Sequence, residues 1–397
     1  MIRWLVRITL MTLLAALLVT GAFESGFALS RTQFPPASSE DSVPADWKPY
    51  VAVFREAWNY VQQDFYKAPL DPDVLANGSV AGMVQALGDP HTAFTDAKRA
   101  AISRTDLEGS FEGIGATVEM REGRFTIVAP IKGSPAEKAG LLPNDIILQV
   151  NDTIIQNMDI TQAIMLARGP KDTSVTLTVQ RGAQAPFLVT LVRDVIRMPF
   201  VESRMIEGTT IAYLRLNEFG ATAPDEMRAA LEELLAQNPI GLIFDLRRDP
   251  GGYLSAAVDV ASQFLGDDQV VLIEKDKQGN AQELKTTGDG LATNIPMVLL
   301  IDSGSASASE IVAAALKDYQ RATLIGVKTY GKGSVQNLHT LSDQSELRVT
   351  IAHFFSPKGN EINEVSVAPD IEVKVTDDDT ANKRDPQLDA AVKFLQK

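Results

Sequence analysis

The chain has 397 residues, which at about 150 residues per domain allows two or three domains, and its 45% hydrophobic and 22% charged residues exclude disordered, collagen-like and multi-span membrane classes. Its 37 Lys and Arg and 51 Asp and Glu give a formal charge of −14, which repels a phosphate backbone and argues against a nucleic-acid partner. The chain contains no cysteine, which excludes disulfides, thiolate catalysis, iron–sulfur clusters and cysteine-ligated zinc.

Residues 1–28 are interpreted as a signal peptide or a membrane anchor. Two arginines, Arg3 and Arg7, precede an uncharged run over residues 8–23, which is shorter than the roughly 20 residues that cross a bilayer. Cleavage after Ala28 is the preferred interpretation, and an uncleaved anchor is the alternative. Both predict that the rest of the chain lies in the periplasm, outside the cell or in the cell envelope, and meets the membrane only through this segment.

A linker rich in Pro and Ser, residues 29–48, precedes a predicted helical unit over residues 49–104. Apolar side chains recur there at spacings of three and four residues, which places them on one face of a helix. Such a stripe packs either within its own domain or against a second subunit, so a monomer and a homodimer or larger homo-oligomer are both left open. The first helix carries Val51, Phe54, Trp58, Val61 and Phe65, and a second carries Val80, Val84 and Leu87.

Short apolar runs replace this pattern over residues 105–194 and predict a compact β-rich module. One helix is expected within it, over residues 160–167. The predicted strands are 114–120, 125–130, 146–150, 174–180 and 186–191.

Strands alternate with helices over residues 195–375, which is typical of an α/β domain built in layers. A tail over residues 376–397 ends in an amphipathic helix, predicted for 385–397. The chain is therefore predicted to be an α/β (α+β multidomain) protein. Within its layered domain the predicted strands are 210–216, 241–246, 296–301 and 322–326, and the predicted helices are 224–236, 254–265 and 306–318.

The segment Ser303–Glu310 contains mainly small residues and several hydroxyls between an apolar strand and an apolar helix. Small side chains let a substrate backbone approach closely, and a hydroxyl at a helix N-terminus lies near N–H groups that can stabilise a developing oxyanion. The alternative is that these serines cap the helix, a role that would suit Ser303, Ser305 or Ser309. Capping explains some of the hydroxyls but not the whole run of small residues.

A nucleophilic serine needs a base, and the three histidines give little support for one. His91 falls in the predicted helical region, and His339 and His353 fall in strand-like runs without a recognisable motif. Lys332, which lies between two glycines, is the better candidate because burial can lower the pKa of a lysine toward neutrality. The alternative is a solvated lysine in a surface loop.

Tandem glycines end the segment Asp245–Gly252, directly after a predicted buried strand. Glycines at the carboxyl end of an α/β strand expose backbone N–H donors without side-chain obstruction, which suits an oxyanion hole. A plain tight turn is the alternative.

Together and in this order, these three segments resemble those of the carboxyl-terminal processing peptidases, Ser-Lys endopeptidases related in fold to the crotonase and Clp protease families. The resemblance covers residues 50–375. The family's Gly-Ser-Ala-Ser-Ala-Ser-Glu signature occurs at Gly304–Glu310 and implies that Ser307 is the nucleophile. Its Gly-Lys-Gly-Ser-Val-Gln signature occurs at Gly331–Gln336 and implies that Lys332, 25 residues after Ser307, is the general base and that Gln336 orients it.

The same resemblance implies an oxyanion hole made by the N–H groups of Gly252 and Ala308, with the choice between Gly251 and Gly252 open. The chain departs from the family at one position of this turn. The family usually has Asn before Pro-Gly-Gly, and this chain has Asp249. The added negative charge could slow acylation, or one of the two arginines that precede it could neutralise it.

The β-rich module also gains an interpretation from the resemblance. The segment Gly109–Gly115 resembles the carboxylate-binding loop of PDZ domains, and the strand after it could accept an extended peptide by β-augmentation. The segments 133–141 and 145–147 match the usual PDZ helix-turn-strand pattern. The implied peptide-binding residues are Phe111, Gly113, Ile114 and Gly115.

Arg168 follows the predicted helix of this module. It matches a family arginine proposed to link peptide binding to an ordered active site, and the alternative is a solvated cation at a helix end. The implied architecture is a crotonase/Clp-like protease core over residues 195–375, with an inserted PDZ domain over residues 105–194 and the small N-terminal helical unit.

The resemblance implies an exported serine endopeptidase that binds the C-termini of unstructured protein substrates and cleaves upstream with a Ser-Lys dyad, without a metal or an organic cofactor. An adaptor protein is a further expected partner. A PDZ scaffold or chaperone of weak catalytic power is the alternative, and Asp249 is its support in the sequence. A crotonase-type acyl-transfer enzyme is a second alternative, against which the export signal argues because a CoA substrate is cytoplasmic.

Overall fold

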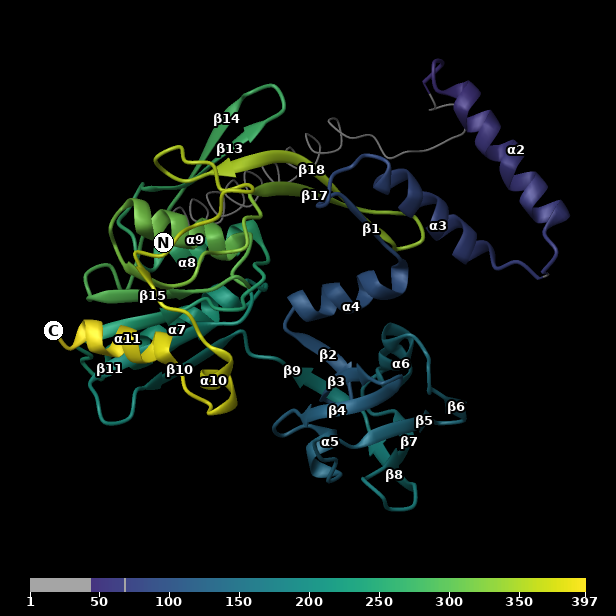
Figure 1. Ribbon diagram of the computed structural model, residues 1–397, viewed down its shortest axis with the longest axis horizontal. Helices are drawn as coiled ribbons and strands as arrows, with labels where there is room; N and C mark the ends of the chain where they lie inside the picture. Colours follow the sequence, from purple (N-terminus) through teal and green to yellow (C-terminus); the bar gives the residue numbers. More distant parts are fainter. Residues whose placement is uncertain (1–43, 68) are drawn as a thin grey trace, which may run out of the picture. The chain divides into compact units, whose positions relative to one another are not determined.

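The computed structural model describes residues 44–67 and 69–397, which form two compact units divided after Leu75 (Figure 1). The expected signal segment 1–28 and residues 29–43 of the expected linker lie outside the described residues. Among the described helices, none combines the length and the apolar character needed to traverse a bilayer.

The first unit contains the helix α2 (Lys48–Asp64), where the sequence predicts a helix with an apolar stripe. No residue of α2 is buried, and Phe54 and Phe65 are 53% and 51% exposed. The first unit by itself therefore leaves this face uncovered. The next helix, α3 (Pro72–Gln85), crosses the division between the units and buries Val84.

The α/β domain is built on a central sheet of six strands. Its first two strands are antiparallel, and each later neighbour is parallel. In sheet order the strands are β10 (Val201–Met205), β11 (Ile211–Leu216), β12 (Gly241–Asp245), β15 (Met297–Ile301), β16 (Thr323–Gly326) and β19 (Ile371–Glu372).

Helices cover both faces of the central sheet, which explains why its strands read as continuous apolar runs (Figure 1). Along β11, Leu214 packs into a core shared with α7 (Ala223–Leu235), α8 (Leu254–Ser262) and α9 (Ala308–Asp318). The alternate side chain Tyr213 faces the other side, toward α11 (Pro386–Leu395). A short helix, α10 (Asp377–Ala381), precedes α11.

A second sheet of five strands lies beside this core, and its hairpins were not among the predicted strands. It carries β17, which contains Gln336, and β17 pairs with the ten-residue strand β18. The strands are β1 (Ala93–Thr95), β18 (Glu346–Phe355), β13 (Val270–Asp276), β14 (Ala281–Lys285) and β17 (Ser334–Thr340). The prediction that His91 lies in a helical region is wrong, because His91 lies in the turn between α3 and β1.

The β-rich module has a core of its own, formed between one main sheet and the helix α6 (Ile160–Ala167). Its first main strand begins at Ala116 rather than at the predicted Ile114, because Gly115 has a φ of +75° and interrupts the strand. The helix α4 (Ala97–Leu107) crosses the expected division at residues 104 and 105. The remaining elements are β2 (Ser110–Gly113), β3 (Ala116–Arg121), β4 (Arg124–Pro130), α5 (Pro135–Lys138), β5 (Ile146–Val150), β6 (Thr153–Ile154), β7 (Ser174–Gln180), β8 (Phe187–Val192) and β9 (Asp194–Arg197).

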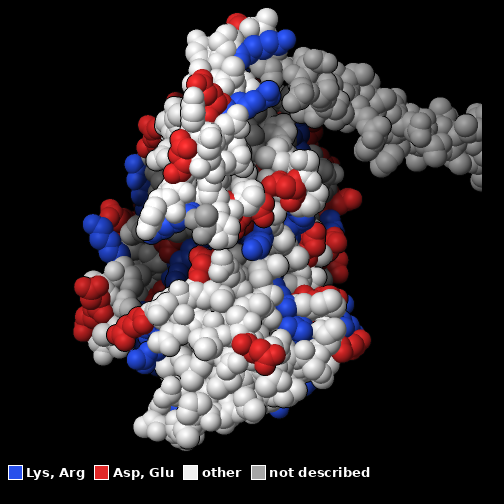
Figure 2. Space-filling model, turned by 90° about the vertical axis from the view of Figure 1, so that its right-hand side faces the viewer, with Lys and Arg blue, Asp and Glu red and all other residues white. Residues whose placement is uncertain are grey.

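Charged side chains of both signs are mixed on the protein surface. On the face shown in Figure 2, Lys and Arg lie among Asp and Glu rather than in one continuous basic area. Several of the described surface charges are paired, as in the contact of Arg99 with Asp159 at 3.2 Å.

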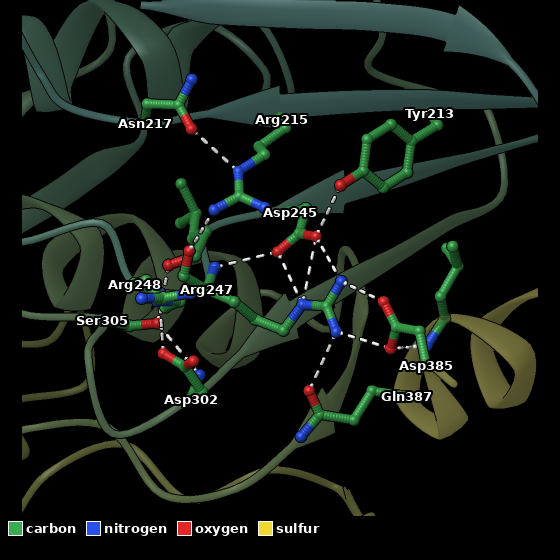
Figure 3. A network of polar contacts seen from close by, with 12 residues as sticks. Tyr213, Arg215, Asn217, Asp245, Arg247, Arg248, Asp302, Ser305, Asp385 and Gln387 are labelled. Carbon is green, nitrogen blue, oxygen red and sulfur yellow. Dashed lines mark hydrogen bonds and ion pairs between the residues drawn. The ribbon is translucent and has the colours of Figure 1, made fainter. Parts of the chain in front are cut away.

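The C-terminal helix is attached to the central sheet by a polar network around Arg247 (Figure 3). The Arg247 guanidinium donates to both carboxylate oxygens of Asp245 at the end of β12 and to both of Asp385, the N-cap of α11, at 2.8 and 2.9 Å. Gln387 accepts a further bond from Arg247 at 3.1 Å, and the Tyr213 hydroxyl donates to Asp245 at 2.7 Å. Burial and the charge of Asp245 raise the pKa of Tyr213 to about 12, so the phenol remains a donor.

Replacing Asp385 with Ala is expected to lower the free energy of unfolding by about 1–2 kcal/mol, because a charged acceptor of Arg247 is lost at a position that water partly screens. Although burial raises the pKa of Asp385, the bonds from Arg247 lower it below its usual value. The stabilisation is therefore present above about pH 4 and is lost as the pH falls further. Urea unfolding at pH 7 and pH 3 measures this.

The matched control is Asp389→Ala, an exposed aspartate in the same helix. Equal losses of stability in the two variants at pH 7 would contradict the role given to Asp385.

Candidate active site

Three loops that carry the predicted site residues leave neighbouring parallel strands at the same edge of the central sheet. The strands β12, β15 and β16 are adjacent and parallel. Their carboxyl ends lead into the glycine turn 245–252, the serine turn 302–307 and the lysine loop 327–333. Parallel strands place such loops together, and this is the usual position of ligand sites in α/β sheets.

Ser307 is the residue at which the serine turn enters α9. Its φ is +53°, a left-handed conformation that is costly for a residue with a side chain. The predicted helix start at 306 is therefore wrong by two residues, since α9 begins at Ala308 with Ser307 as its N-cap. Ser307 is half-buried, between the exposed Ser303 and the fully buried Ser309.

The neighbouring serines have structural partners, which separates them from Ser307. The buried Ser305 hydroxyl donates to the carbonyl of Leu246 at 2.7 Å, and the buried Ser309 hydroxyl donates to the carbonyl of Asp249 at 2.9 Å. The two bonds tie the serine turn to the glycine turn. They also account for two of the three serines that the sequence offers as helix caps.

A single buried carboxylate, that of Glu310, joins the serine turn to the lysine loop. It accepts the N–H of Ser307 at 3.0 Å, the N–H of Lys332 at 2.8 Å and the N–H of Gly331 at 2.6 Å. The Thr329 hydroxyl donates to it at 2.6 Å. With four donors around a fully buried carboxylate, the position of Lys332 is fixed relative to Ser307.

The Lys332 side chain is half-buried and is held by Gln336 on β17. Its Nζ donates to Gln336 Oε1 at 3.2 Å, while Gln336 Nε2 donates to the backbone carbonyl of His91. Burial lowers the pKa of Lys332, and the positive charge of Arg348 lowers it further, against an opposing effect of Glu310. The structure thus brings Lys332 and Gln336 together as expected, with the lysine poised to lose its proton more easily than a surface lysine.

The glycine turn lies directly against the serine turn. A Cβ on Gly251 would lie 2.8 Å from Ser307 Cβ and 2.9 Å from the backbone nitrogen of Ala308, so only glycine fits there. The Gly251 N–H is already donated to Asp249 Oδ1 at 2.8 Å. The N–H groups of Gly252 and Ala308, in contrast, donate to no residue that the structure describes.

The turn at residues 89–92 supports the site and was missed by sequence reasoning. The Asp89 carboxylate accepts the N–H groups of His91 at 3.0 Å and Thr92 at 3.1 Å, and the Thr92 hydroxyl accepts the N–H of Thr350 on β18 at 3.1 Å. Burial by itself raises the pKa of Asp89, but its contacts with Thr350, Thr92 and His91 lower it to about 2. Gly88-Asp89-Pro90 signals a turn, but no local pattern shows that it supports Gln336.

The expected peptide-binding residues gather beside a cavity of about 210 Å³ between β3 and α6. Phe111, Ile114, Gly115 and Arg168 line it, whereas Gly113 packs against the Phe111 ring. The Ile114 side chain belongs to the core of the module, so this residue offers its backbone rather than its side chain. The carbonyls of Ile114 and Gly115 are bonded within the module, while their N–H groups donate to no described residue.

Arg168 is not a solvated helix-end cation, since its side chain is only 17% exposed. It donates to the Thr105 hydroxyl at 2.7 Å and to Asp106 at 2.8 Å, both on α4, and lies 4.1 Å above the Phe111 ring. It therefore connects the cavity to α4.

Within residues 44–67 and 69–397, no group of three or more His, Asp or Glu side chains is arranged to hold a metal ion. His91 contributes its backbone carbonyl, and His353 lies beside Glu361 at 3.5 Å.

Two family models match the chain. Peptidase family S41 matches residues 210–373, which contain the serine, lysine and glycine segments, and a PDZ domain model matches residues 126–181 in the β-rich module.

Individual proteins are similar over most of the chain. The carboxy-terminal-processing protease of Bartonella bacilliformis is 34% identical over 361 residues, which cover 90% of this chain and 81% of that protein. The carboxy-terminal processing protease CtpA of Bacillus subtilis is 34% identical over 81% of this chain and 68% of its own length. A solved structure from Bacteroides fragilis assigned to the S41 proteases has a TM-score of 0.54 at 18% identity, over 85% of this chain and 96% of that one, which supports the fold alone.

Replacing Glu310 with Gln is expected to lower the free energy of unfolding by about 2–4 kcal/mol, because an amide cannot accept from all four buried donors and its NH₂ group would face at least one of them. Chemical denaturation of the full chain measures the loss. Glu232→Gln, an exposed position on α7, serves as the control. A Glu310→Gln variant as stable as this control would show that the carboxylate does not hold the two loops together.

Proposed function

The chain belongs to the carboxy-terminal processing proteases of peptidase family S41, which are serine peptidases, and we propose that it cleaves peptide bonds with Ser307 as nucleophile and Lys332 as general base. The observation that carries the proposal is the environment of Lys332. Its side chain is half-buried, its pKa is lowered and its Nζ donates to Gln336, which suits a proton acceptor. Glu310 joins the loop of Lys332 to the turn that carries Ser307. No metal or organic cofactor takes part in the proposed chemistry.

The proposed reaction begins with neutral Lys332, which accepts the hydroxyl proton of Ser307 as the serine oxygen attacks the substrate carbonyl. The N–H groups of Gly252 and Ala308 stabilise the oxyanion that forms. Gly252 is favoured over Gly251 because the Gly251 N–H is already bonded to Asp249. Lys332 then protonates the leaving amine, and water hydrolyses the acyl-enzyme by the same proton transfers in reverse.

The PDZ domain is proposed to bind the C-terminus of the substrate. Pairing of an extended peptide with β3 would place its carboxylate near the free N–H groups of Ile114 and Gly115, beside the cavity lined by Phe111. A peptide in this cavity would contact Arg168, which is hydrogen-bonded to Thr105 and Asp106 on α4. From α4, Arg104 contacts the buried Glu346 of β18 at 3.0 Å, and β18 pairs with the strand that carries Gln336.

The proposal also covers the location of the protein, its self-association and a further partner. The charge and apolar pattern of residues 1–28 supports export to the periplasm, the cell surface or the cell envelope, with this segment cleaved or kept as an anchor. The exposed apolar side chains of α2 and its C-cap, such as Phe54 and Phe65, support self-association into a homodimer or larger assembly. An adaptor protein that delivers substrates is a further proposed partner.

A PDZ scaffold or chaperone that binds C-terminal tails without efficient cleavage is the alternative function. Asp249 is the observation in its favour, because an acidic residue replaces the family's usual Asn beside the oxyanion turn. A serine-reactive probe that labels the wild type but not Ser307→Ala would favour the protease.

Ser307→Ala and Lys332→Ala are each expected to lower kcat for an unfolded protein such as casein by about 1,000-fold or more, since nucleophile and base act as one unit. Because the base must be neutral, the activity of the wild type is expected to rise with pH through the lowered pKa of Lys332. Initial rates from pH 5 to pH 9, with circular dichroism to verify folding, measure both effects. A flat profile between about pH 5 and about pH 9 would count against Lys332 as the base.

Arg168→Ala is expected to reduce the stimulation of cleavage by a peptide with a free C-terminal carboxylate by about 10-fold, the effect of losing a charged hydrogen bond. The loss should appear in kcat rather than in the affinity for the peptide, because Arg168 acts through α4. Arg124→Ala, an exposed arginine of the same domain, is the control. Unchanged stimulation in Arg168→Ala would remove Arg168 from the proposed link.

A further inference from the structure

Asp249 is a buried acid without a counter-ion. Its residue is fully buried, its Oδ1 accepts the N–H of Gly251 at 2.8 Å, and its Oδ2 is inaccessible to solvent and has no hydrogen-bond partner among the described residues. None of the described ion pairs includes it. An ionised carboxylate in such a place would exchange its hydration for one backbone hydrogen bond and no counter-ion, which costs far more than burying the neutral acid.

The charged groups around Asp249 do not supply the missing cation. Arg247 is engaged by Asp245 and Asp385, so the expected neutralisation by this arginine is not observed (Figure 3). The Arg248 side chain is exposed, and its backbone N–H donates instead to Asp302 at 2.8 Å.

The two remaining charged neighbours lie on β11 and in the loop after it. Arg215 directs its guanidinium to Asn217 and to the carbonyl of Arg247, and Glu218 adds a negative charge. Burial raises the pKa of Asp249 well above its usual value, and Glu218 acts in the same direction. The Gly251 N–H, the nearby Ser309 hydroxyl and the charge of Arg215 oppose this increase without cancelling it.

Asp249 also lies at the junction of the two turns that form the proposed oxyanion hole. Its carbonyl accepts the N–H of Ala306 at 3.0 Å and the Ser309 hydroxyl at 2.9 Å, which fixes it to the serine turn. Its side chain holds Gly251, whose φ of +102° leads into Gly252. The Asp249 side chain therefore sets the conformation that presents the Gly252 N–H.

We propose that Asp249 works as a neutral carboxylic acid, a positioning residue that holds the Gly251–Gly252 turn, and that loss of its proton at alkaline pH slows the reaction. The proposal rests on the proposed protease function. The neutral acid has the shape and the carbonyl acceptor of an asparagine. An ionised Asp249 would place a negative charge beside the developing oxyanion in a water-poor site, which opposes its stabilisation.

The first test compares kcat/KM against pH for the full wild-type chain, Asp249→Asn and Asp249→Ala. Wild-type activity is expected to rise as Lys332 loses its proton and then to fall by about 10- to 100-fold as Asp249 ionises. Asp249→Asn should lose the alkaline decrease, because its amide cannot ionise. Asp249→Ala should also lack this decrease, but its kcat/KM should lie below that of Asp249→Asn at every pH, because Gly251 loses its acceptor. An alkaline decrease that persists in Asp249→Asn would overturn the proposal.

The second test does not require catalysis, so it separates failure of this inference from failure of the proposed function. A folded-state pKa above the unfolded value makes the native state less favoured as pH rises from about 4 toward the folded pKa. Asp249→Asn should therefore gain Tm relative to the wild type as the pH is raised from 4 to 8. The exposed Asp389→Asn is the control.

The infrared difference spectrum between the wild type and Asp249→Asn at pH 7 should contain the carbonyl band of a protonated acid. A carboxylate band in its place, with a Tm difference that does not change with pH, would refute the neutral acid even if the enzyme cleaves protein. If the band of the protonated acid and the pH-dependent Tm difference are both found in a chain that does not cleave protein, they would support the neutral acid and reject the protease.

Discussion

The arrangement of the site depends on one buried carboxylate, that of Glu310. A loop that carries a proposed nucleophile and a loop that carries a proposed base are separate in the sequence, and neither is regular secondary structure. Glu310 accepts backbone N–H groups from both, so hydrogen bonds to one fully buried side chain set the distance between the backbones of Ser307 and Lys332. The left-handed conformation of Ser307 is maintained by the same contacts that join the loops.

The proposed chemistry requires two groups to be neutral in one site. Lys332 must lose a proton that a surface lysine would keep, and Asp249 must keep one that a surface aspartate would lose. Burial acts on both in the required direction, because it penalises whichever form is charged. Low solvation of this sheet edge therefore favours both the neutral lysine that the proposed base requires and the neutral acid proposed beside the Gly251–Gly252 turn.

Part of the support of the site comes from outside residues 210–373, which match the peptidase family. The His91 carbonyl, which holds Gln336, belongs to the turn before β1, and Arg168 reaches α4 from the PDZ domain. The C-terminal helix braces the strand-end Asp245 through Arg247. Segments before and after the matched region therefore contact residues of the site. Such contacts allow a core of parallel strands to carry an inserted domain and still keep the site residues in place.

The sequence by itself determined the features that depend on neighbouring residues. Continuous apolar runs identified the buried strands of the central sheet, and the helix over 160–167 and the strand over 146–150 have the predicted bounds, because period and turn residues are local. The two signatures identified the family, which the comparisons show, and singled out Ser307, Lys332 and Gln336, whose catalytic roles stay a prediction.

Only the tertiary structure decided which groups those residues meet. The β17–β18 hairpin gave only strand-like runs around His339 and His353, because its half-exposed strands depend on pairing of β18 with β1 and β13, which are distant in the chain. Packing between distant segments decides that Glu310 joins two loops and that Asp249 is buried without a cation. Burial and hydrogen-bond partners are properties of the folded chain, so a single sequence names the residues of this site but does not assign their protonation states or their supports.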